Sequence, residues 1–308
     1  MSSTLQRRAL LALSLAAAAA LTACGSSSVE SALEPDRFLV VGDGFSDIGQ
    51  GPNGTAPTVN DGSRLWTQEL ANYYNKTITS ANAGGYSYAQ AYARVSQADI
   101  TGHNATSITD QVTKLLAATS IGANDVVLMS AGLSDVYAEV EAAGGVITDT
   151  TRANVSAAGT AYGKQVRRLL DAGATHVAMT GVYNVGNSPW ARAFGDDTAK
   201  EITKLAVRFN DAALIEVTDL WQKVLWRDSA LMYNVVYNDP ETYALTDKST
   251  AVCTVPDVYN CTTSTLVAGA DSQKYLWADG IHMTPRIIRM FGSRDYSESL
   301  ASQLKERW

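Results

Sequence analysis

A carboxylate and an imidazole stand three residues apart near the end of the chain, at Asp279 and His282. A carboxylate at this spacing can accept a hydrogen bond from the ring, which fixes its tautomer and raises its basicity. Such a pair supplies the base and the orienting group of a hydrolytic triad. The pattern alone does not establish catalysis, because Asp-x-x-His sequences also occur for structural reasons. A nucleophile and the elements that position it must therefore be found elsewhere.

Short apolar segments alternate with helical patterns over most of the chain. Segments 37–41, 125–131 and 175–182 are rich in apolar β-formers, which is typical of buried parallel strands. Apolar residues at helical spacing predict helices over 107–119, 151–170, 199–220 and 285–304. This alternation predicts an α/β protein, a three-layer α/β/α sandwich with a mostly parallel, flavodoxin-like sheet.

Ligands of such folds bind at the carboxyl ends of the strands. The loops 43–49, 132–135 and 279–282 are therefore the candidate site segments. The aromatic residues between Tyr88 and Tyr92 could shape an acyl or sugar pocket beside them. Of the other histidines, His103 lies in a polar loop and is expected to be exposed. His176 begins an apolar segment and is expected to be structural.

Composition excludes several classes of function. The chain has 308 residues and a formal net charge of −7, which gives no electrostatic support for nucleic-acid binding. Mean hydropathy is −0.07 and no long apolar run follows residue 23, so a polytopic membrane protein is excluded. Three Cys and three His residues, without Cys-x-x-Cys or His-x-x-x-His spacing, predict no metal site. We expect no cofactor and a monomer.

The N-terminal segment has the features of an export signal. Arg7 and Arg8 precede an apolar run over 9–20, and the segment that ends at Cys24 resembles the bacterial lipobox. The resemblance implies cleavage before Cys24 and acylation of its thiol; the alternative is an ordinary signal peptide with an incidental cysteine. We expect a signal peptide over 1–23, a lipidated Cys and flexible tether over 24–36, and one domain over 37–308. Gly25 after the cysteine favours the outer membrane of a Gram-negative cell.

Cys253 and Cys261 remain once Cys24 is assigned to a lipid. In an oxidising compartment they are expected to form one disulfide bond, the alternative being two free thiols.

Several blocks, in order, resemble the SGNH or GDSL family of esterases and lipases. They lie at 38–50, 84–95, 131–135, 209–214 and 279–285. The resemblance implies the SGNH-hydrolase fold and ester hydrolysis by a serine on the turn after the first strand. It also implies an oxyanion hole made of the nucleophile's own N–H, a Gly N–H of the second block and an Asn side chain of the third.

The residues at these positions depart from the family pattern. Asp279 and His282 match the orienting group and the base. Gly44, however, stands at the nucleophile position, Ala91 at the second-block Gly and Ser134 at the third-block Asn. Ala91 keeps a backbone N–H and Ser134 a shorter donor, but Gly44 offers no nucleophile.

The resemblance therefore implies an ester hydrolase whose activity is weak or lost. Two substitutes for the serine are open: Ser46 as an alternative nucleophile, and water activated by His282. The alternative function is a pseudoenzyme, a cell-envelope lipoprotein that binds a ligand or has a structural role. A generic solute-binding lipoprotein is disfavoured, because the chain shows no two-lobe organisation. The expected ligand is an ester, an acyl-lipid or an acylated glycan, with the membrane reached through Cys24.

Overall fold

The computed structural model describes residues 33–293, 303–304 and 307–308. Four parallel strands form its main sheet in the order β1 (Phe38–Val41), β2 (Val126–Ser130), β3 (His176–Thr180) and β4 (Val224–Arg227). The residues of β1 and β2 are all buried, as expected for strands covered on both faces. The predicted α/β class with a parallel sheet is confirmed.

A further segment extends the sheet beyond β1. Val40 N–H donates to the Tyr86 carbonyl at 3.0 Å, and Tyr88 N–H donates to the Val40 carbonyl at 2.8 Å. This bridge runs parallel to β1. It carries the second sequence block along the edge of the sheet and delivers residues 89–92 to the end of β1.

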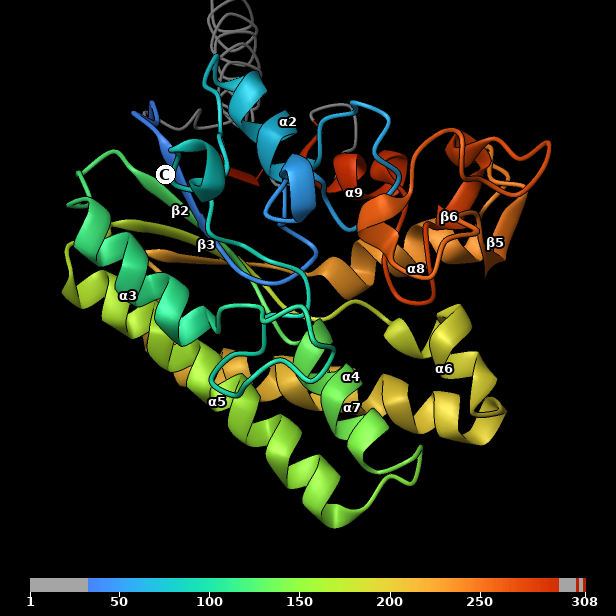
Figure 1. Ribbon diagram of the computed structural model, residues 1–308. Coiled ribbons are helices and arrows are strands. Elements are labelled where there is room, and N and C mark those ends of the chain that lie inside the picture. Colours follow the sequence, from blue (N-terminus) through green and yellow to red (C-terminus); the bar gives the residue numbers. More distant parts are fainter. Residues whose placement is uncertain (1–32, 294–302, 305–306) are drawn as a thin grey trace, which may run out of the picture.

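Helices cover both faces of the sheet (Figure 1). One layer holds α3 (Ile108–Ala118), α4 (Leu133–Ala142), α5 (Asp149–Asp171) and α7 (Asp196–Val217). The opposite layer holds α2 (Trp66–Tyr73) and α9 (Pro285–Gly292), which contact each other. Two of the predicted helices begin at side-chain caps, Ser107 for α3 and Thr148 for α5.

A smaller unit lies beyond the main sheet, next to α8 (Ser229–Asn238) in Figure 1. It is a parallel pair of strands, β5 (Asp247–Ala251) and β6 (Tyr275–Trp277). A short helix, α6 (Pro189–Ala193), follows β3. The remaining helices are single 3₁₀ turns at Pro52–Gly54, Ala81–Ala83, Val185–Asn187, Thr218–Leu220, Val258–Asn260 and Ser272–Lys274.

The ends of the chain differ in part from the predicted boundaries. The last helix was expected to run unbroken from 285 to 304, but α9 ends at Gly292, because Ser293 is extended (φ −77°, ψ 141°); Gln303 and Leu304 are again helical. At the other end, Leu33 N–H donates to the Trp308 carbonyl and Asp36 N–H to the Asn124 carbonyl. The final residues of the predicted tether are therefore attached to the domain. The predicted signal peptide and Cys24 lie outside the described residues.

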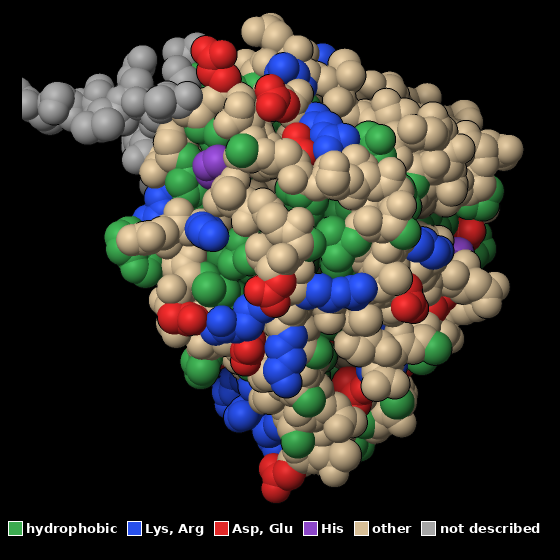
Figure 2. Space-filling model, turned by 90° about the vertical axis from the view of Figure 1, so that its left-hand side faces the viewer, with side chains coloured by type: hydrophobic (Ala, Val, Ile, Leu, Met, Phe, Trp, Pro, Cys, Tyr) green, Lys and Arg blue, Asp and Glu red, His purple; other side chains and the backbone are tan. Residues whose placement is uncertain are grey.

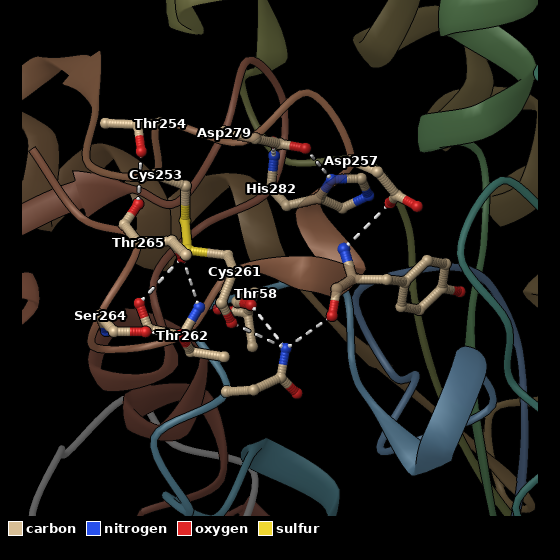
Figure 3. The surroundings of a disulfide bond; sticks show 12 residues. Thr58, Cys253, Thr254, Asp257, Cys261, Thr262, Ser264, Thr265, Asp279 and His282 are labelled. Atoms are coloured by element: carbon tan, nitrogen blue, oxygen red, sulfur yellow. Dashed lines mark hydrogen bonds and ion pairs between the residues drawn. A yellow bond between two sulfur atoms is a disulfide. The ribbon is translucent and has the colours of Figure 1, made fainter.

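Two further sequence predictions concern covalent and membrane structure. Cys253 and Cys261 form a disulfide bond with their Cα atoms 5.8 Å apart, which confirms that prediction (Figure 3). Within the described part of the chain, no helix combines the length and apolar character needed to cross a bilayer.

Candidate active site

The loop after β6 holds His282 against Asp279. Asp279 Oδ2 lies 2.8 Å from His282 Nδ1, and Asp279 Oδ1 accepts the backbone N–H groups of Ile281 and His282 (Figure 3). Further contacts fix the loop: Ala278 N–H donates to the His282 carbonyl at 2.8 Å, and the Tyr183 hydroxyl donates to the Ile281 carbonyl. The carboxylate thus fixes both the tautomer and the direction of the ring.

Charge and burial act in opposite directions on this pair. Burial alone would lower the pKa of His282, but the charge and hydrogen bond of Asp279, with Asp43 and Asp47, raise that pKa above its usual value. Burial likewise opposes ionisation of Asp279, yet the charge and hydrogen bonds of His282 hold the pKa of Asp279 below its usual range. The His282 side chain is almost fully buried. Its Nε2 has no hydrogen-bond partner among the described residues.

Gly44 lies on the turn after β1 and faces that free ring nitrogen. A Cβ atom built on Gly44 would stand 2.9 Å from His282 Nε2 and 3.0 Å from its Cδ2. The position that resembles the family's nucleophile therefore does lie across from the base. It carries no side chain, so the Asp279–His282 pair has no hydroxyl partner there.

The Ser46 hydroxyl is hydrogen-bonded to residues other than His282. Its Oγ donates to Ser130 Oγ at 2.8 Å and accepts the Trp66 indole N–H at 3.2 Å, and its side chain is fully buried. Ser130 in turn donates to the Asp43 carboxylate. The alternative nucleophile is therefore corrected: Ser46 belongs to a buried hydrogen-bond chain that joins the turn after β1 to β2 and α2.

The Ala91 N–H is not available to a ligand. It donates to Asp47 Oδ2 at 3.0 Å, and the same carboxylate accepts the Tyr259 hydroxyl at 2.7 Å. Asp47 also accepts two N–H groups of its own turn. The prediction of Ala91 as an oxyanion donor is therefore wrong in this structure, because a buried carboxylate already holds that N–H.

The next residue, Tyr92, has a left-handed backbone conformation. Its φ is +65°, an uncommon value for a residue with a Cβ. Among the described residues, neither the Tyr92 N–H nor the Gly44 N–H has a hydrogen-bond partner. Sequence reasoning missed Tyr92, because nothing in a tyrosine signals a left-handed conformation.

Ser134, the third predicted donor, is the second residue of α4 and is mostly buried. Its hydroxyl forms no hydrogen bond with any described residue. The neighbouring Leu133 N–H donates to Asp43 Oδ2, so the start of α4 is tied to the turn that carries Gly44.

His103 also lies at this site, contrary to its expected exposure. Its ring stacks on Tyr92 at 4.5 Å, and Tyr92 stands edge-on to His282 at 5.5 Å. The side chain of His103 is 28% exposed, and its Nε2 lies 3.6 Å from Asp257 Oδ2 on the disulfide loop. His176, in contrast, begins β3 and packs against Trp308, as expected for a structural residue.

A second buried acid lies close to Ser134. Burial raises the pKa of Asp135 to about 7, although Arg94 opposes this shift from 3.7 Å. Both residues line a pocket of about 500 Å³. No group of three His, Cys, Asp or Glu residues in the described ranges is arranged to hold a metal ion.

Comparisons with known proteins bear mainly on the fold. No protein-family model and no curated protein matches the chain. An extracellular lipase from Streptomyces rimosus is similar at 17% identity, over 64% of this chain and 81% of the lipase, with a TM-score of 0.39. An inhibitor-bound aryl esterase from M. smegmatis is similar at 16% identity, over 88% of this chain and 99% of the esterase, with a TM-score of 0.46.

At TM-scores below 0.5 and identities below 20%, these similarities support no conclusion about the reaction that this protein catalyses. What the site can do rests on its own residues: a buried, oriented base, two backbone donors without a partner among the described residues, and a Gly44 that has no nucleophilic side chain.

Proposed function

We propose that the protein is an ester-hydrolase-like lipoprotein of the bacterial cell envelope, in which serine-dependent hydrolysis is lost and only slow hydrolysis remains. The observation that carries this proposal is that Nε2 of the Asp279-held His282 faces Gly44. Removing the nucleophile of a serine hydrolase lowers turnover about a millionfold. Substrate binding and the oxyanion hole still accelerate hydrolysis roughly 10³-fold over the reaction in water.

The remaining reaction uses water. His282 Nε2 accepts a proton as a water oxygen attacks the ester carbonyl carbon, and Asp279 stabilises the resulting imidazolium. The Gly44 and Tyr92 N–H groups donate to the oxyanion, and such donors are worth a few kcal/mol each. As the C–O bond breaks, His282 returns the proton to the departing alkoxide. No acyl-enzyme forms.

The test is an assay with short-chain aryl esters on the form that lacks residues 1–24. We expect slow turnover that disappears in His282→Ala and persists in His176→Ala, a matched control because His176 packs at the start of β3. A fluorophosphonate probe should label no serine. Labelling of any serine, Ser46 included, would show an intact serine hydrolase and refute the proposal.

A second candidate function is a pseudoenzyme that binds an acyl ligand without turnover. Its support is the engaged Ala91 N–H, which takes one expected oxyanion donor out of the site. The same preparation discriminates the two functions. Saturable binding of the aryl ester with no turnover above His282→Ala favours the binding protein.

The anchor and the ligand belong to the same proposal. Cys24 carries the lipid and tethers the domain to the outer membrane, where a monomer meets an ester, an acyl-lipid or an acylated glycan. Labelled palmitate should enter the full-length chain but not Cys24→Ser, and the variant should leave the membrane fraction. Equal palmitate labelling of the full-length chain and of Cys24→Ser would contradict the proposed lipid anchor at Cys24.

A further inference from the structure

Three aromatic rings from separate segments surround the loop that carries Asp279 and His282. Tyr92 stands edge-on to His282 at 5.5 Å. Trp190 is bound to the loop itself, because its backbone N–H donates to the Gly280 carbonyl at 3.0 Å. Tyr137, from α4, packs against Trp190 with ring centres 5.1 Å apart. All three rings are partly exposed, so a ligand at His282 would meet them.

Carboxylates share this space with the rings. After burial, the charges of Asp279 and Asp99 raise the pKa values of both Tyr92 and Tyr137. Asp257 adds to the effect at Tyr92 and Glu141 at Tyr137. We call these three rings and four carboxylates the acidic aromatic group. Contacts place these acids beside the rings: the Trp190 indole N–H donates to Glu141 at 2.6 Å, and Asp257 lies 3.6 Å from the His103 ring that stacks on Tyr92.

No basic side chain of the described chain neutralises this group. None of its four carboxylates forms an ion pair with Lys or Arg there: Asp279 pairs with His282, and Asp257 approaches only His103. Elsewhere acids and bases do pair, as in Arg37–Asp125 and Arg94–Glu139. Lys and Arg side chains gather on the face shown in Figure 2, with acidic side chains beside several of them.

The aromatic rings of the group, like its carboxylates, lack the basic partners that similar side chains have elsewhere in the described chain. Four Lys or Arg side chains lie over aromatic rings elsewhere, at Tyr86, Phe291, Tyr237 and Trp221. Over Tyr92, Tyr137 and Trp190, the described residues place no such cation. The acidic aromatic group therefore has the chemistry of a cation site but lacks a cation from its own chain.

A second observation points to a ligand at this place. His282 is 3% exposed, yet its Nε2 has no hydrogen-bond partner among the described residues. The ring is buried but Nε2 itself is not enclosed, so a ligand can reach that nitrogen. A ligand that accepts or donates at Nε2 would supply the missing partner.

We propose that the ligand carries an ammonium group, which the acidic aromatic group holds while the ester or acyl part lies at His282. The inference rests on the proposed function and adds the ligand's charge. A cation over an aromatic face gains about 0.5–1 kcal/mol when exposed and about 2 kcal/mol or more when desolvated. Carboxylates with no basic partner add attraction that a neutral ligand of the same shape does not receive.

The experiment compares choline with 3,3-dimethylbutan-1-ol, its uncharged isostere, by titration calorimetry on the full-length protein. We expect choline to bind about tenfold more tightly than the isostere, the ratio that a single cation–π contact of this strength gives. Equal affinities, or no saturable binding of choline, would overturn the inference.

Variants locate the site. Asp257→Asn keeps the oxygen that accepts the Tyr259 N–H but removes the charge, and Tyr137→Leu keeps an apolar side chain but removes the ring. Both should reduce choline affinity severalfold and leave the isostere unchanged. Glu241→Gln removes an exposed charge outside the group and should change neither. Unchanged choline binding in both site variants contradicts the assignment.

The result is separable from the proposed function, because choline is not an ester. Choline binding without ester turnover would support the cation site and contradict the proposed hydrolytic activity. Ester turnover without a preference for choline would do the reverse.

Discussion

Gly44 can accept a side chain only if His282 moves slightly. Its φ lies outside the left-handed region, so a Cβ costs no backbone strain, but that Cβ would meet His282 Nε2 at 2.9 Å. We expect Gly44→Ser and Gly44→Ala to lower the free energy of unfolding by about 1–3 kcal/mol each, as overpacking does. Because only the serine adds a hydroxyl near Nε2, only Gly44→Ser should gain fluorophosphonate labelling.

The alanine variant is the control for this experiment, since it brings the same Cβ without a nucleophile. Urea unfolding and probe labelling measured on both variants decide the result. Labelling of neither variant would mean that the hydroxyl does not reach Nε2 or that the oxyanion donors are misplaced.

The Asp279–His282 pair predicts a defined pH window. Asp279→Asn should lower the pKa of His282, which NMR titration of the ring measures, whereas Glu241→Gln should leave it unchanged. Because the folded pKa of His282 is raised above 6.5, its stabilising effect is full below 6.5 and is lost as pH rises through the folded pKa. The lowered pKa of Asp279 makes its effect present above 3.8 and lost as pH falls through the folded pKa. An unchanged His282 pKa in the variant would contradict this coupling.

At the level of single residues, side-chain chemistry was easier to predict than backbone direction. Asp279 and His282 meet because they stand three positions apart on one tight loop. Whether the Ala91 N–H points to a ligand or to Asp47 depends on the φ of the following residue and on Tyr259, more than 160 residues away. His103 was placed wrongly for a similar reason, because the tyrosine it stacks on is fixed by that same turn.

At the level of elements, periodic helices and fully buried apolar strands were predicted well, whereas polar or partly exposed strands were not. The helices α3, α5 and α7 and the strands β1 to β3 lie within a few residues of their predicted bounds. Strand β4 is a short Val-Leu-Trp-Arg segment with two partly exposed residues, and it was not predicted. Strand β5 is mostly polar, so its pairing partner and not its own sequence makes it a strand.

The loop closed by the disulfide supplies two residues of the site. We therefore expect the disulfide to stabilise both this loop and the fold. Asp257 lies beside His103 and Tyr259 donates to Asp47, and both stand between Cys253 and Cys261. Closing a loop with a sequence separation of 8 contributes about 2–3 kcal/mol. The double variant Cys253→Ser/Cys261→Ser should lose that much in urea unfolding.

Reductant is the control for the loop. It should lower the stability of the parent to that of the double variant and leave the variant unchanged. A variant as stable as the oxidised parent would mean that packing around Val258 and Tyr259 holds the loop without the covalent bond.

At the level of the whole molecule, the site lies at the carboxyl ends of the strands of the main parallel sheet. Gly44 follows β1, Ser134 follows β2, and the loop with His282 arrives from the smaller sheet. This is the edge where parallel α/β folds bind ligands, which explains why strand alternation alone identified the correct loops. It could not identify the contribution of the smaller sheet, because β5 and β6 gave no strand signal.

Buried acids at this edge predict how the stability of the whole domain depends on pH. Burial raises the pKa values of Asp43, Asp47 and Asp135, the last to about 7. An acid whose folded pKa is raised keeps its proton in the fold while the unfolded chain loses it, so stability falls as pH rises from about 3.8 through the folded pKa. His282, with its raised pKa, acts in the same direction. The free energy of unfolding in urea should therefore be higher at about pH 5.5 than at about pH 8. Asp135→Asn should reduce that difference, because the amide has no proton to lose, and a domain more stable at the higher pH would contradict the burial argument.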